Sequence, residues 1–230
     1  LAIAQLLGYN SHADYVLENR MAENAANVNQ LLDQLLTAYL PAAKEEVKAV
    51  QEMAARTEGK DFELMPWDWS FYSEKLRSEK YSLNDEMVRP YFKLENVTKG
   101  VSGLATRLYG ITFEENKDIP VFHPDVKAYD VLDKDGSYLA VIYTDFFPRA
   151  GKRSGAWMTN YKEQYVKDGV DSRPHVSITM NFTKPTESKP ALLTQDEVET
   201  FLHEFGHALH GIFAATNYPS MGGTNVYRDF

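Results

Sequence analysis

The stretch from 194 to 213 constrains the fold more than any other part of the sequence, because it predicts one amphipathic helix with a defined start. Thr194 and Glu197 have the spacing of a capping box, in which each side chain binds the backbone amide of the other residue. Apolar residues then recur along one face at helical spacing: Val198, Phe201, Leu202, Phe205, Leu209, Ile212 and Phe213. We therefore expect this face to be buried against another layer and the opposite face to be open.

The opposite face of this predicted helix carries histidines. His203, Glu204 and His207 form the pattern His-Glu-x-x-His, and histidines four apart lie one above the other on a helix. Two neutral imidazoles can hold one Zn²⁺, while a carboxylate that stays off the metal can act as general base toward water. The pattern thus predicts His203 and His207 as metal ligands and Glu204 as the base. The alternative is a solvated helix face without a metal.

His210 lies on the same face as His207. At about 1.5 Å per residue it is about 7.5 Å along the axis from the midpoint of the other two histidines, too far to bind the same ion. A supporting hydrogen bond or a packing role is therefore favoured for His210. Phe213 stands where a metzincin has its third histidine, so that class is excluded. A downstream carboxylate is expected as the third ligand.

Further motifs accompany this helix along the whole chain. They are Leu6-Leu7-Gly8-Tyr9, Pro66-Trp67-Asp68-Trp69, His123-Pro124-Asp125-Val126, Gly155-Ala156-Trp157-Met158, Asn181-Phe182-Thr183-Lys184-Pro185 and Gly223-Thr224-Asn225. With these motifs the chain resembles the thimet oligopeptidase and peptidyl-dipeptidase family of zinc metallopeptidases. Within that family it is more similar to the bacterial peptidyl-dipeptidase (dipeptidyl carboxypeptidase) branch.

The resemblance implies a zinc-dependent peptidase that hydrolyses short peptides, with His203 and His207 as zinc ligands and Glu204 as general base. The branch favours release of C-terminal dipeptides, while an endo-acting oligopeptidase of the same family stays open. In the family, the residues that match Arg228, Asp229 and Phe230 are followed by Val-Glu, and that glutamate is the third zinc ligand. It would therefore lie beyond Phe230.

Two further hypotheses stay open. The 230-residue chain by itself could be a catalytically inert fragment that lacks the third zinc ligand. Asp229 could accept a hydrogen bond from a ligand histidine, against the default of an ordinary surface aspartate.

Composition narrows the partners. A net charge of −9 without a Lys/Arg cluster argues against nucleic acid and against anionic membrane surfaces. No apolar run is long enough to span a bilayer. The absence of cysteine excludes disulfides and thiolate metal sites. The sequence begins Leu1-Ala2-Ile3-Ala4 without the basic segment of a signal peptide, so no signal peptide is predicted and a cytoplasmic location is the expectation.

The periodicity divides the chain into two regions. Residues 1–110 predict a helical region, with a break or kink at Pro41 and a stop at Gly110. Residues 111–230 predict a β-hairpin with its turn at Asp135-Gly136 and further strands, together with the His-Glu-x-x-His helix, as part of a larger peptidase catalytic domain. The expected fold is therefore mainly α with a small β-sheet (α+β), in which a zincin-type active-site helix lies beside a few strands. The basic loop 148–155 is predicted either to be solvated or to contact a substrate carboxylate.

Overall fold

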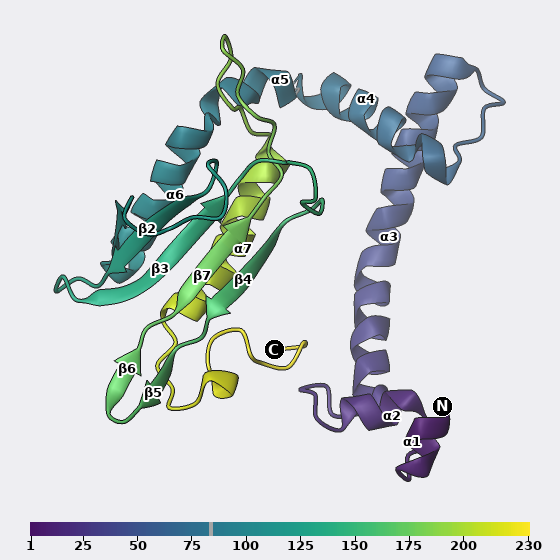
Figure 1. Cartoon of the computed structure of the whole chain (residues 1–230). Helices are drawn as coiled ribbons and strands as arrows, with labels where there is room; N and C mark the ends of the chain where they lie inside the picture. Colours follow the sequence, from purple (N-terminus) through teal and green to yellow (C-terminus); the bar gives the residue numbers. More distant parts are fainter. Residues whose placement is uncertain (83–84) are drawn as a thin grey trace. The chain divides into compact units, whose positions relative to one another are not determined.

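The computed structural model describes residues 1–82 and 85–230, which form two compact units (Figure 1). One unit contains Leu1–Asn84 and Tyr227–Phe230, and the other contains Asp85–Val226. The prediction of a mainly α fold with a small sheet is confirmed. Within the described residues, no helix is long and apolar enough to cross a membrane.

The first unit is helical. Its helices are α1 (Ala2–Leu6), α2 (His12–Leu17), α3 (Ala25–Glu58) and α4 (Trp69–Tyr81), with a 3-10 turn at Pro66–Asp68. The C-terminal part of α3 packs on α4 through Val50, Met53, Ala54 and Tyr72. α3 continues through Pro41, so the predicted break does not occur. A proline removes one helical hydrogen bond, and the alanines, lysine and glutamates that follow Pro41 favour continuation of the helix.

A five-stranded sheet organises the second unit. Its strands are β1 (Thr112–Glu115), β2 (Lys127–Leu132), β3 (Tyr138–Asp145), β4 (Trp157–Lys162) and β7 (His175–Thr179). The order is β1-β2-β3-β7-β4, and β3 and β7 are parallel while the other pairs are antiparallel. The predicted hairpin is β2–β3, whose turn holds Gly136 at a φ of +82°. A separate ribbon joins β5 (Tyr165–Lys167) to β6 (Val170–Ser172).

Two helices cover one face of this sheet (Figure 1). After α5 (Asp85–Val88), α6 (Leu94–Tyr109) ends at Gly110 as predicted, with Gly110 at a φ of +82°. The predicted helix at 194–213 is α7 (Gln195–Ile212). Side chains of α6 and α7 share one core with the sheet, including Val101 and Phe205 from the helices and Ile142 and Ile178 from the strands.

The predicted capping box starts α7. The Glu197 amide donates to Thr194 Oγ1 at 3.1 Å, and the Thr194 amide donates to Glu197 Oε2 at 2.8 Å. The buried face is narrower than the apolar pattern indicated, because Leu202 and Phe213 are 40% and 38% exposed. Small residues contribute to the buried face instead, namely Ala208 and Gly211.

Gly211 marks the closest approach of α7 to the sheet. A Cβ at this position would lie 2.9 Å from Asn160 Oδ1, 2.9 Å from Met158 Cε and 3.0 Å from Val176 Cγ1. These side chains belong to β4 and β7, so even one methyl group at Gly211 would force the helix away from this edge of the sheet or displace its side chains.

The two compact units divide near residue 85, whereas the sequence placed the boundary between the helical and strand regions at 110. The difference arises from α6, which is helical but packs on the sheet and shares its core. The division of the chain into 1–110 and 111–230 as domains stays a prediction.

Replacement of Gly211 by alanine is expected to lower the free energy of unfolding by about 1–3 kcal/mol, because the added methyl group overpacks the helix–sheet contact. Gly206 lies on the same helix, and a Cβ added there would meet nothing within 4 Å. Gly206→Ala is therefore the matched control, with an expected gain of about 0.5–1 kcal/mol from helix propensity. Denaturant unfolding of both variants measures the difference, and equal stabilities would contradict the packing argument.

Candidate active site

α7 brings the two predicted metal ligands together. His203 Nε2 and His207 Nε2 are 3.2 Å apart, and both rings are exposed. Zinc binds imidazole nitrogen at about 2.0–2.1 Å in tetrahedral sites, which places two such nitrogens roughly 3.3 Å from each other. The observed separation fits two ligands of one ion. Their roles as zinc ligands stay a prediction.

Glu204 lies beside this pair in a cleft of about 260 Å³. The side chain is 8% exposed and lines the cleft together with His207. The remaining lining residues are Ala156, Trp157, Met158 and Thr224. A carboxylate and an imidazole thus reach the same space, which has the groups needed for proton transfer next to a metal.

The start of β4 contributes a second wall to this cleft. The strand lies at the edge of the five-stranded sheet, beside α7 (Figure 1). The sequence singled out Gly155-Ala156-Trp157-Met158 only as a family motif, and gave these residues no place in the site. No local pattern could have indicated this contact, because the strand and the His-Glu-x-x-His residues lie far apart along the chain and meet only in the folded structure.

A loop also contributes to the cleft through Thr224. Its own hydrogen bonds and its contact with α7 hold this loop in place. Asn225 Nδ2 donates to the carbonyl oxygens of Pro219 and Gly222, at 3.0 and 3.1 Å. Gly223 has a φ of +57°, and a Cβ there would lie 3.4 Å from Gly211 Cα. The loop therefore packs directly on the backbone of α7.

The loop that leads into β4 is fixed by a buried carboxylate. Asp145, 2% exposed, accepts from Arg149 at 2.7 and 2.8 Å and from Lys152 at 2.9 Å. Lys152 Nζ also donates to the carbonyl of Phe147 at 2.8 Å. Burial alone would raise the pKa of Asp145, but the hydrogen bonds from Arg149 and Lys152 outweigh it and hold that pKa below its ordinary value.

Asn181 fixes the same loop at its other end. Its Nδ2 donates to the carbonyl oxygens of Arg153 and Gly155, at 2.9 and 2.7 Å. The two basic residues Arg149 and Lys152 bind Asp145, so neither prediction for the 148–155 loop describes them. The exposed side chain of Arg153 instead lies over the Trp157 ring, with its guanidinium carbon 5.0 Å from the ring centroid.

His210 and Asp229 complete the sequence candidates. His210 is exposed and follows His207 by about one helical turn. Asp229 belongs to the helical unit, where its carboxylate accepts a hydrogen bond from the Ala22 amide at 3.1 Å. Partial burial acts to raise the pKa of Asp229, but the amides of Ala22 and Met21 lower it overall. In the parts of the chain that the structure describes, no group of three His, Cys, Asp or Glu residues is placed to hold a metal.

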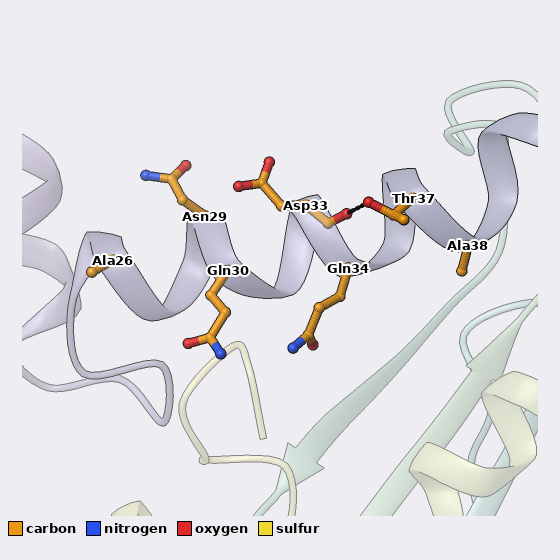
Figure 2. A pocket seen from close by; sticks show the side chains of 7 residues that line it. All are labelled: Ala26, Asn29, Gln30, Asp33, Gln34, Thr37 and Ala38. Carbon is orange, nitrogen blue, oxygen red and sulfur yellow. Dashed lines mark hydrogen bonds between the residues drawn. The ribbon is translucent and has the colours of Figure 1, made fainter.

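A larger hollow of about 740 Å³ lies against α3. Its lining residues all come from that one helix, and Figure 2 shows Asn29 and Asp33 pointing to one side while Gln30 and Gln34 point to the other. Neither a histidine nor a cationic side chain is among them. The cleft beside α7 is therefore the better candidate for a catalytic site, despite its smaller volume.

Similarity to known proteins extends over the whole chain. The family model for Peptidase family M3 matches residues 1–230. The dipeptidyl carboxypeptidase of Escherichia coli is 40% identical over 228 residues, which is 99% of this chain and 33% of that protein. Oligopeptidase A of the same organism is 39% identical over 222 residues, 96% of this chain and 32% of that protein. The mitochondrial intermediate peptidase of Yarrowia lipolytica is 30% identical over 257 residues, 100% of this chain and 33% of that protein.

The chain belongs to peptidase family M3. It spans about a third of the length of the relatives named above.

Removal of the buried carboxylate tests the role of the loop. Asp145→Asn leaves the buried Lys152 ammonium without its counter-charge, which is expected to cost about 3–5 kcal/mol of unfolding free energy. The folded pKa of Asp145 is lowered, so its stabilisation is complete above the unfolded value of about 3.9 and is lost as the pH falls below it. Urea unfolding should therefore show a gap between wild type and variant that narrows below about pH 4. A gap independent of pH would contradict this account.

Proposed function

We propose that this chain carries the catalytic helix of a zinc-dependent peptidase that hydrolyses short peptides and releases C-terminal dipeptides. The observation that carries the proposal is the convergence of His203 Nε2 and His207 Nε2, with His207 and Glu204 lining a cleft whose other wall is an edge strand. Membership of peptidase family M3 supports peptide hydrolysis as the reaction class.

His203 and His207 would hold the zinc, since the spacing of their nitrogens suits one tetrahedral ion. When bound, zinc would polarise the scissile carbonyl and lower the pKa of an attacking water. Glu204 takes the proton of that water on its carboxylate and passes it to the nitrogen of the leaving amine. The low exposure of Glu204 keeps its carboxylate close to the cleft and limits competing solvent.

β4 supplies a means of binding the substrate. An edge strand has free backbone amide and carbonyl groups, and an extended peptide can pair with them. Such pairing reads the main chain and tolerates many side chains, in keeping with a peptidase for varied short peptides. The similarity to a protein named dipeptidyl carboxypeptidase favours dipeptide release, and the similarity to oligopeptidase A keeps the endo-acting alternative in view.

The third zinc ligand is proposed to come from a glutamate that follows Phe230 in the family pattern. Two imidazoles alone would leave zinc weakly held, so catalysis is proposed to need this glutamate. Partners other than peptides are not proposed: the net charge of −9 disfavours nucleic acid and anionic membrane surfaces. The cytoplasmic location expected from the sequence stays a prediction.

Glu204→Gln in the full-length peptidase tests the assignment. Loss of the general base should lower kcat by at least about 100-fold, while the zinc content measured by atomic absorption stays at the wild-type level. Glu114→Gln, which neutralises an exposed carboxylate on β1, is the control and should keep full activity. Undiminished turnover in Glu204→Gln would remove Glu204 from the mechanism.

A further inference from the structure

Arg153 differs from the other basic residues of its loop. Arg149 and Lys152 are committed to the buried Asp145. Among the ion pairs found in the described residues, none involves Arg153, whose side chain is exposed. An exposed guanidinium that is fixed in place but not neutralised is available to an anion.

The position of Arg153 is fixed from two sides. Asn181 Nδ2 holds its carbonyl oxygen at 2.9 Å. Its guanidinium carbon lies 5.0 Å from the centroid of the Trp157 ring, a cation–π distance. Because Trp157 lines the cleft and is the first residue of β4, this stacking places a positive charge beside the cleft wall at the start of the strand.

Strand direction then determines which end of a peptide reaches this charge. β4 runs from Trp157 to Lys162 and pairs with β7 in antiparallel fashion. A peptide added to the free edge in the commoner antiparallel sense runs the opposite way. Its C-terminal end therefore points toward Trp157 and the Arg153 guanidinium.

We propose that Arg153 binds the C-terminal carboxylate of the peptide substrate and so determines specificity for cleavage near a free C-terminus. A guanidinium suits this ligand because its planar fork can donate two parallel hydrogen bonds to one carboxylate. A local cation is also needed there, since the chain carries a net charge of −9 and holds Glu204 in the same cleft. The proposal rests on the proposed peptidase function and adds that Arg153 recognises the C-terminal end of the substrate.

The test measures peptide binding without turnover, in the full-length protein carrying Glu204→Gln. Two peptides of identical sequence are compared by calorimetry, one with a free C-terminal carboxylate and one with a C-terminal amide. We expect the acid to bind at least about tenfold more tightly than the amide, as a charged hydrogen-bonded pair would give. Arg153→Gln should abolish this difference and leave amide binding unchanged.

Lys167→Gln is the matched control, because it removes one exposed positive charge from β5 outside the cleft. The Lys167→Gln variant should keep the preference for the acid. If the preference came only from general attraction to positive charge, Lys167→Gln would weaken the preference as much as Arg153→Gln does. Equal binding of acid and amide, or a preference that survives Arg153→Gln, would overturn the proposal. Turnover is assayed separately, in the protein without the Glu204→Gln change. If that protein cleaves neither peptide but the preference still depends on Arg153, the proposed reaction is contradicted and the Arg153 binding site is upheld.

Discussion

The close approach of α7 to the β4–β7 edge is the constraint on which the site depends. Gly211 allows the helix to lie where a single Cβ would collide with Asn160, Met158 and Val176. The same contact places Glu204 and His207 opposite the start of β4, across a cleft of about 260 Å³. The distance between the Glu204 carboxylate and β4 is therefore set by the packing of Gly211 against the sheet as well as by the position of Glu204 on α7.

The strand side of the cleft is held by polar interactions that do not touch the cleft itself. Asp145 fixes the loop before β4 through two basic side chains, and Asn181 holds the carbonyls at the loop's end. A buried carboxylate with two cationic partners is a costly way to stabilise a loop, but it tolerates few alternative geometries. We infer that this arrangement keeps Trp157 and Arg153 in one position relative to α7.

Local patterns in the sequence predicted the parts of this structure that depend on neighbouring residues. The sequence predicted three such features: the Thr194–Glu197 capping box, the turn at Gly136 and the end of α6 at Gly110. The pairing of Asp145 with Lys152 and the placement of β4 against α7 were not, because they depend on contacts between residues that no short-range periodicity encodes. The exposure of Leu202 was also not predicted. The closest contact between α7 and the sheet is made by the small residue Gly211, and a pattern of large apolar residues does not reveal such a contact.

Diffraction from the full-length protein on both sides of the zinc absorption edge tests the central claim directly. The account predicts one strong anomalous peak within bonding distance, about 2.0–2.1 Å, of both His203 Nε2 and His207 Nε2. A peak bonded to only one of these nitrogens, or located away from α7, would contradict it.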